Sequence, residues 1–338
     1  MGKKILFIGG SINQTSMMHQ ISLKMKDCDS YFSPYYGDGY IDFFAKRGVL
    51  DFSILGGEFK KSTENYLNSH NLNIDYQGKR HNYDLVFTGS DLIIPKNIRD
   101  KRLILVQEGM TDPENFMYHL VKHLGLPRWM ASTSATGLSD LYDILCVASE
   151  GYRELFIRKG VKPEKIVVTG IPNFDNLKTY LNNNFPMKNF VLVATSDSRE
   201  TFKYENRKKF ILDCVKIANG KQLIFKLHPN ENFKKATREI NEYAPGALVY
   251  TSGDINEMIA KCDILITKYS SVSYVGISLG KEVHSYFDLE ELKRLNPIQN
   301  NGTSAERIAK IALHLLKQPK SYPININEFQ NISETVNV

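Results

Sequence analysis

The chain has 338 residues, of which 42% are hydrophobic and 24% are charged, and its formal net charge is +6. This composition excludes collagen-like and disordered chains, and the length predicts two domains. Because no apolar run approaches the roughly 18–20 residues that span a bilayer and the basic residues are dispersed, we expect a cytoplasmic protein that binds no nucleic acid.

In the first half of the chain, short apolar and β-branched segments alternate with segments of helical periodicity. The sequence predicts a strand at 5–8, a glycine loop and a helix over 17–25. Further strands are expected at 84–90, 102–109, 144–149 and 165–170. Near-continuous apolar strands of this kind are typical of parallel sheets that are covered on both faces.

The second half repeats this pattern, with strands expected at 190–195, 222–229, 262–267 and 282–287. Asp254 and Thr303 are each followed by a glutamate three residues later, a pattern that predicts a helix start. Residues 172–188 are polar and rich in asparagine, which indicates a linker. We therefore predict domains at 1–176 and 189–320, a linker at 177–188 and a tail at 321–338.

Polar residues that follow the strands of the second half are candidates for a phosphate site, because ligands of open parallel sheets bind beyond the carboxyl ends of the strands. Lys226 and His228 end one strand on the same face, although a lone histidine is more often structural. Ser270 and Ser271 precede a predicted helix at 272–279, where their hydroxyls either bind an anion or only cap the helix.

Two further cations follow strands of the second half. Lys268 comes shortly before the serine pair, and Arg199 follows the strand at 190–195, where a planar guanidinium suits bidentate phosphate contact. An ordinary surface arginine is the alternative for Arg199. No cysteine or histidine spacing suggests a metal site, and the pair Asp27 and Asp29 lies before a strand, at the wrong edge for a metal.

The first half offers a carboxylate and a hydroxyl-rich loop. Glu108 follows the strand RLILVQ, where it either acts as a general base or only caps a loop. Asp91, Asp112 and His19 are its competitors. The hydroxyl-rich loop is the first loop, where Ser11, Asn13 and Thr15 can hold an acceptor or a phosphate. This loop lacks the fixed glycines or lysine of a dinucleotide or Walker motif.

Five segments are similar to known proteins. KLHPN (226–230) and the stretch 263–294, which begins DILITKYSS, are similar to the donor-binding half of polyol-phosphate transferases. VQEGMTD (106–112) and VLVATSDSRETF (191–202) are similar to epimerase segments, and 143–177 to the segment that leads out of a first domain. The chain thus resembles the GT-B superfamily, in the group shared by UDP-N-acetylglucosamine 2-epimerases and CDP-glycerol-type glycerophosphotransferases.

Four residues depart from those families. Lys268 stands where polyol-phosphate transferases usually carry an aspartate before Tyr-Ser-Ser, and Glu108 begins a Glu-Gly-Met-Thr where they offer His-Gly-Thr. Tyr274 and Val275 occupy the positions at which epimerases carry a pair of ribose-binding glutamates. These departures bear on both activities that the resemblance implies.

The resemblance implies an α/β fold of GT-B type, with two Rossmann-like domains whose mostly parallel sheets face a central cleft. The first is the acceptor side and the second binds the nucleotide donor. From this we predict a glycosyltransferase that uses a nucleotide-activated sugar, a UDP-sugar first, to extend a surface polysaccharide or glycolipid. The acceptor is expected to be a glycan or lipid-linked chain, with contact at the inner face of the membrane as an option.

Glu108 and His228 are the expected catalytic residues, and the expected substrate-binding residues are Ser11, Asn13, Thr15, Arg199, Lys226, Lys268, Ser270 and Ser271. Neither a metal nor another cofactor is expected. Three alternatives stay open: an isomerase of the 2-epimerase kind, a CDP-polyol phosphotransferase, and a catalytically silent nucleotide-binding scaffold.

Overall fold

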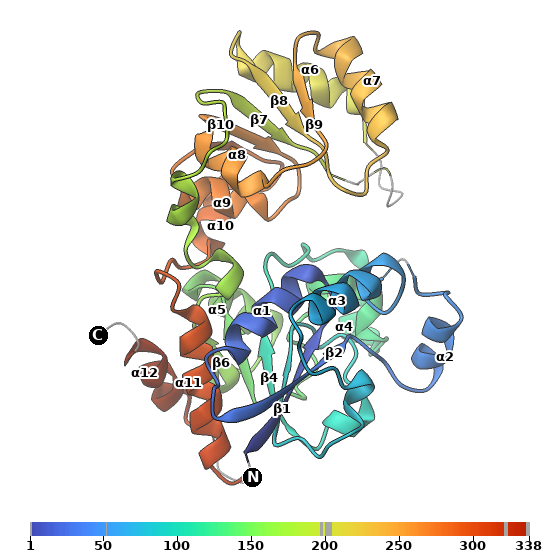
Figure 1. Ribbon diagram of the computed structural model, residues 1–338, viewed down its shortest axis with the longest axis vertical. Coiled ribbons are helices and arrows are strands. Elements are labelled where there is room, and N and C mark those ends of the chain that lie inside the picture. The colour runs from blue at the N-terminus through green and yellow to red at the C-terminus, as the bar shows by residue number, and fades with distance from the viewer. Residues whose placement is uncertain (1, 52, 197–198, 200–204, 321–323, 336–338) are drawn as a thin grey trace. The chain divides into compact units, whose positions relative to one another are not determined.

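The computed structural model describes residues 2–51, 53–196, 199, 205–320 and 324–335. The chain forms two compact units, one of Met1–Asp175 with Asn300–Val338 and the other of Asn176–Gln299. Each unit is built on a parallel sheet with helices packed against it (Figure 1). The prediction of two α/β units with parallel sheets is therefore confirmed.

Within the described residues, the sheet of the first unit has six parallel strands in the order β2-β1-β3-β4-β5-β6. These strands are β1 (Lys3–Gly9), β2 (Cys28–Pro34), β3 (Leu85–Thr88), β4 (Arg102–Val106), β5 (Ile144–Val147) and β6 (Ile166–Val168). The helices are α1 (Ile12–Ser22), α2 (Tyr40–Lys46), α3 (Gly57–Ser69), α4 (Phe116–Leu124), α5 (Glu150–Lys159), α11 (Ser304–Lys317) and α12 (Ile326–Glu334).

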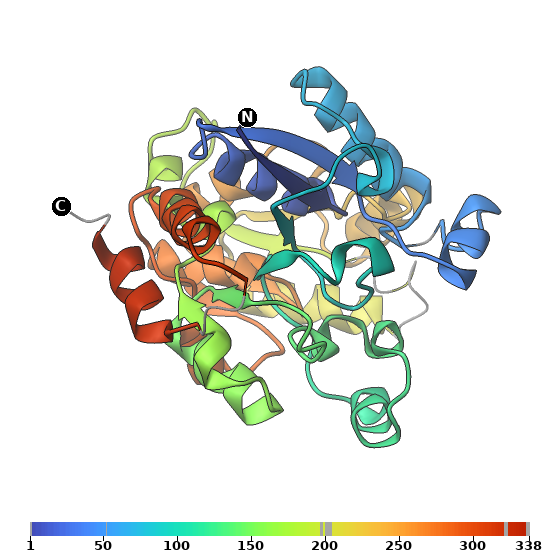
Figure 2. The ribbon, with the colours of Figure 1, turned by 90° about the horizontal axis from the view of Figure 1, so that it is seen from below.

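The core of the first unit contains residues from both the beginning and the end of the sequence. Phe7 of β1 packs in one buried cluster with Met18 of α1, Ile308 of α11 and Phe329 of α12. Figure 2 shows α11 and α12 as neighbouring helices of this unit. The strands β3, β4 and β5 are buried along their whole length, as expected for parallel strands with both faces covered.

In the described part of the second unit, five parallel strands follow the order β11-β10-β7-β8-β9. They are β7 (Val191–Ala194), β8 (Leu223–Lys226), β9 (Leu248–Tyr250), β10 (Ile264–Thr267) and β11 (Glu282–His284). The helices are α6 (Arg207–Ala218), α7 (Phe233–Tyr243), α8 (Ile255–Lys261), α9 (Val272–Ser278) and α10 (Leu289–Leu295). Val193, Phe225, Phe210 and Ile240 belong to its core.

Most predicted elements are present, with differences at a few places. The strand β9 was not predicted, and α1 begins at Ile12, well before the expected helical segment. Asp254 caps α8 as expected, its carboxylate accepting the Asn256 N–H at 2.8 Å. None of the helices in the described part of the chain is both long and apolar enough to cross a bilayer.

The end of the second unit differs from the predicted boundary at residue 320. Residues 300–320 lie with the first unit, where Ile308 of α11 is part of the core. Asp175 caps this helix: its carboxylate accepts the Asn300 N–H at 2.6 Å and the Ser304 N–H at 2.5 Å. Thr303 does not cap this helix and donates its hydroxyl to the Asn300 carbonyl at 2.8 Å. In the expected tail, α12 packs against β6, where Gln330 exchanges hydrogen bonds with the Val168 backbone.

Candidate functional site

Three adjacent strands of the second unit end at one edge and bring most of the predicted donor-side residues together. Parallel pairing aligns Thr267 of β10 with Ala194 of β7, and Ala194 with Lys226 of β8. The residues that follow these strands therefore share the carboxyl edge of the sheet, where ligands of open α/β sheets bind. Among them are His228 and the serine pair at 270–271.

The backbone of His228 is held by a neighbouring hydroxyl and a carboxylate. The His228 N–H donates to Thr195 Oγ1 at 3.0 Å and to Glu231 Oε2 at 2.9 Å. The ring Nδ1 accepts the Asn230 N–H at 3.3 Å. A neutral ring that accepts at Nδ1 carries its proton on Nε2, so this half-buried histidine offers Nε2–H as a donor.

Lys226, at the end of β8, is a largely buried cation. Its Nζ donates to the Leu227 carbonyl at 3.2 Å, which uses one of the three donors of an ammonium group. Burial lowers the pKa of Lys226, and the nearby Asp254 carboxylate opposes that shift. Desolvated charge interacts more strongly with an anion than exposed charge does, so Lys226 suits a phosphate ligand.

Ser270 and Ser271 are half-buried at the start of α9. Ser270 Oγ accepts the Val272 N–H at 3.4 Å, whereas Ser271 makes no side-chain cap hydrogen bond. Simple capping therefore accounts for Ser270 but not for Ser271. Because α9 has only seven residues, the anion affinity predicted here depends on the hydroxyls rather than on a helix dipole.

Lys268, a predicted substrate-binding residue, is paired with a buried carboxylate. Its side chain is buried, its Nζ lies 3.2 Å from Glu205 Oε1, and it lies over the Phe210 ring with 4.6 Å from Nζ to the centroid. Burial lowers the pKa of Lys268, and Glu205 opposes that shift. Its charge thus balances a buried carboxylate, and substrate contact by Lys268 stays a prediction.

One nitrogen of the Arg199 guanidinium is paired with a carboxylate of α7. Its Nη1 donates to both carboxylate oxygens of Glu239 in α7, at 2.9 and 2.8 Å. Its Nε and Nη2 are buried and have no hydrogen-bond partner among the residues that the structure describes. The remainder of the predicted loop, Ser198, Glu200 and Thr201, lies outside the described residues. An anion in contact with Nε and Nη2 would satisfy both donors.

In the first unit, two separately predicted residues meet. Ser11 Oγ donates to Glu108 Oε1 at 2.6 Å and accepts the Gln14 N–H at 3.1 Å as the N-cap of α1. Gln14 Nε2 donates to the other oxygen, Glu108 Oε2, also at 2.6 Å. Sequence reasoning did not find Gln14, although it lies one helical turn beyond Ser11. The carboxylate therefore lies at the carboxyl ends of β1 and β4, oriented by two donors.

The other residues of the first loop differ in their surroundings. Asn13 is exposed, and its carbonyl accepts the Asn173 side-chain N–H at 2.8 Å. Thr15 is buried, and its hydroxyl donates to the Ser11 carbonyl at 2.7 Å within the first turn of α1. This hydroxyl thus bonds a carbonyl of its own helix, and substrate binding by Thr15 stays a prediction.

The competitors of Glu108 have structural roles. Asp91 is fully buried and accepts two backbone N–H groups at 2.9 and 3.0 Å. Asp112 accepts two hydroxyl groups at 2.8 Å. His19 contacts the Tyr66 hydroxyl of α3 at 3.2 Å, and burial followed by the nearby His70 lowers its pKa. Glu108 remains the best-placed base candidate in this unit.

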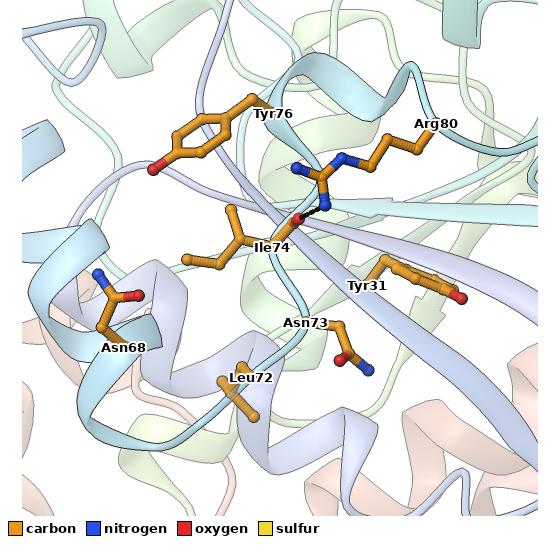
Figure 3. Close-up of a pocket in the computed structure, with 7 residues that line it drawn as sticks. All are labelled: Tyr31, Asn68, Leu72, Asn73, Ile74, Tyr76 and Arg80. Carbon is orange, nitrogen blue, oxygen red and sulfur yellow. Dashed lines mark hydrogen bonds between the residues drawn. The ribbon is translucent and has the colours of Figure 1, made fainter.

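A hollow of about 420 Å³ lies in the first unit beside the edge strand β2 (Figure 3). Its lining residues are Tyr31, Asn68, Leu72, Asn73, Ile74, Tyr76 and Arg80. The Arg80 guanidinium donates to the Ile74 carbonyl at 3.0 Å across it. None of the predicted site residues lines this hollow.

Comparison with solved structures establishes the fold class. The fold is similar to the Staphylococcus aureus MnaA–UDP co-structure, with a TM-score of 0.59, 12% identity and coverage of 96% of this chain and 99% of that one. It is also similar to UDP-GlcNAc 2-epimerase from Neisseria meningitidis bound to UDP-GlcNAc, with a TM-score of 0.53, 14% identity and 98% coverage of both chains. The expected GT-B type of fold is confirmed.

The sequence comparison gives a family resemblance that agrees with the predicted one. Residues 119–279, just under half of the chain, match the family model of CDP-Glycerol:Poly(glycerophosphate) glycerophosphotransferase. No relative was found among curated proteins. The matched segment contains the loops that carry Lys226, His228 and the serine pair. The resemblance to the group of 2-epimerases and glycerophosphotransferases is thus confirmed.

Proposed function

We propose that the chain is a transferase that moves a sugar from a nucleotide-activated donor, a UDP-sugar first, to a cell-envelope polysaccharide or glycolipid. The observation that carries the proposal is the shared carboxyl edge of β7, β8 and β10, which gathers Lys226, His228 and the serine pair. These groups supply the positive charge and hydrogen-bond donors that a leaving nucleoside diphosphate requires. The two neighbours named above, whose structures contain UDP and UDP-GlcNAc, support a nucleotide ligand.

In the proposed reaction, a hydroxyl of the acceptor attacks the sugar carbon and the nucleoside diphosphate leaves. Lys226 and the Nε2–H of His228 stabilise the charge that develops on the departing phosphate. Glu108 accepts the proton of the attacking hydroxyl, and Ser11 and Gln14 hold its carboxylate in place. The acceptor is a glycan or lipid-linked chain at the inner face of the membrane, where the exposed Phe116 and Trp129, at 76% and 52%, supply apolar contact.

A CDP-polyol phosphotransferase is the second candidate, and the family match over residues 119–279 favours it. In that reaction the acceptor hydroxyl attacks phosphorus and cytidine monophosphate leaves, so the same cationic edge serves. The isomerase alternative loses support from the structure. Tyr274 and Val275, at the positions of the ribose-binding glutamates, are buried in the second unit and offer no carboxylate to a ribose.

Thermal unfolding of the purified protein with UDP, GDP, CDP, CMP and dTDP, each with Mg²⁺ or with EDTA, tests the proposal. A ligand at about 100 times its Kd stabilises by about 2.7 kcal/mol, which raises Tm by several degrees in a protein of this size. A UDP or GDP shift supports sugar transfer, and a shift confined to CDP and CMP supports polyol-phosphate transfer. His228→Gln should abolish the shift, and absence of any shift in the native protein contradicts both functions.

A further inference from the structure

We infer that Glu231 is a positioning residue that holds the His228 turn in its ligand-binding geometry. We also infer that a buried chain of alternating charges links this turn to the loop carrying Ser270 and Ser271. The inference rests on the proposed function, because it assigns a role at the same donor site. The sequence resemblance singled out His228 and Lys268, but not Glu231, Arg207 or Glu205.

The Glu231 carboxylate accepts several hydrogen bonds at the turn that begins with His228. Its carboxylate is fully buried. Oε2 accepts the His228 N–H at 2.9 Å and the Thr195 hydroxyl, and Thr195 Oγ1 in turn accepts the same His228 N–H at 3.0 Å. Oε1 accepts a hydrogen bond from Arg207 Nη2. Two of these contacts determine where the backbone of His228 lies, and the Thr195 contact ties it to the end of β7.

Ion pairs connect Glu231 to the loop that carries Ser270 and Ser271. Arg207 Nε lies 3.0 Å from Glu205 Oε1, and the same oxygen lies 3.2 Å from Lys268 Nζ. The side chains of Arg207, Glu205 and Lys268 are 5%, 1% and 10% exposed. The order of charges from Glu231 to Lys268 is therefore negative, positive, negative, positive, and these four charges cancel one another.

Hydrogen bonds also hold the Lys268 end of this charged network. The Lys268 carbonyl accepts the Ser285 hydroxyl at 2.8 Å and the Tyr286 N–H at 3.2 Å. Ser270 follows two residues later, so the ammonium of Lys268 and its backbone together locate the start of the serine loop. Both donor loops of the second unit are thus tied to one buried network.

Stability alone does not account for such a network. Apolar residues of similar volume often replace buried ion pairs with no loss of stability, because desolvation of the charges offsets their attraction. What an apolar side chain lacks is an acceptor for the His228 N–H. A carboxylate at this point supplies that acceptor and pairs Arg207 at the same time, which is the property expected of a positioning residue.

The test compares Glu231→Gln with Ile240→Val, a core change in the same unit that lowers stability without touching the network. Both variants are made in the full chain, and their folding is checked by circular dichroism and Tm. The imidazole C–H signals are recorded by NMR, with that of His228 assigned through His228→Gln. The Kd of UDP and of CDP is then measured by calorimetry. If Glu231→Gln does not fold, Glu231→Asp, which keeps the charge and shortens the reach, takes its place.

We expect Glu231→Gln to shift the His228 signal and to weaken nucleotide binding about tenfold, with Ile240→Val changing neither. An unshifted His228 signal together with an unchanged Kd overturns the inference. If the native protein binds neither nucleotide, the proposed function fails, and the His228 signal alone decides the positioning role. A shift of equal size in Ile240→Val assigns the effect to lost stability and likewise overturns the inference.

Discussion

The replacement Glu108→Gln removes one charge from the first unit and keeps the side-chain volume. In the native structure, both carboxylate oxygens accept a hydrogen bond of 2.6 Å, from Ser11 Oγ and from Gln14 Nε2. A glutamine amide has one oxygen, so it can accept from only one of these donors. We therefore expect the loss of one charge-assisted hydrogen bond in a half-buried setting, about 1–2 kcal/mol, and a fall in Tm of roughly 2–8 °C.

The expected effect on turnover is larger than this loss of stability. A general base contributes about 10²–10⁴ in rate, which corresponds to roughly 3–5 kcal/mol of barrier. A protein with the usual stability of about 5–15 kcal/mol stays folded after losing about 1–2 kcal/mol. Any large fall in turnover of Glu108→Gln would therefore report on the chemical step rather than on unfolding.

The assay measures release of nucleotide from saturating donor in the presence of acceptor, alongside the donor Kd by calorimetry. Glu108→Gln should lose at least a hundredfold in turnover while the Kd changes by less than about threefold. Asp112→Asn is the matched control, because Asp112 is a carboxylate of the same unit that accepts two hydroxyls at 2.8 Å. Turnover of Glu108→Gln close to that of Asp112→Asn would remove Glu108 from the role of base.

Four further substitutions, at three residues, test other parts of the structure. Lys159 is 2% exposed beneath Tyr118, and burial lowers its pKa from 10.5 to about 8, so the unfolded chain binds this proton more tightly. The free energy of unfolding should therefore rise between about pH 8 and pH 10.5. Lys159→Met should remove that rise and increase the free energy of unfolding by up to about 3 kcal/mol at pH 7, which Tm values at pH 7 and pH 10.5 check. Lys268→Asp, which introduces the residue usual in the similar polyol-phosphate transferases, sets a second carboxylate beside the buried Glu205 and should cost about 3–5 kcal/mol. Lys268→Met adds no charge and should cost less, and chemical denaturation that finds an equal loss for both variants would contradict the role of the ion pair with Glu205. Asp175→Ala should lower stability by about 1–2 kcal/mol through the uncapped α11 and leave nucleotide binding unchanged, which chemical denaturation and calorimetry check separately.

Strands such as β3, β4, β5 and β7 were predictable because each is a short, mostly apolar run that is buried along its whole length. The strand β9 was missed since its apolar run, Leu248–Tyr250, has only three residues, too few to show a strand pattern. The boundary near residue 300 was missed for another reason. The pattern around Thr303 predicted the start of α11 correctly, but its cap comes from Asp175, far away in the sequence. Local patterns cannot report a partner that only the fold brings near.

For the candidate site as well, the positions of the residues were predictable, but the partners of their side chains were not. The ends of parallel strands told us where Lys226, His228 and Lys268 lie, because the carboxyl edge of a sheet is set by topology. Whether a side chain there meets ligand or interior depends on distant partners, as Glu205 shows for Lys268. Glu231 is the exception, since an acidic residue three positions after His228 can accept its N–H within a single turn. A search for such local acceptors around candidate catalytic residues would have identified it from the sequence, while the rest of the buried network required the folded chain.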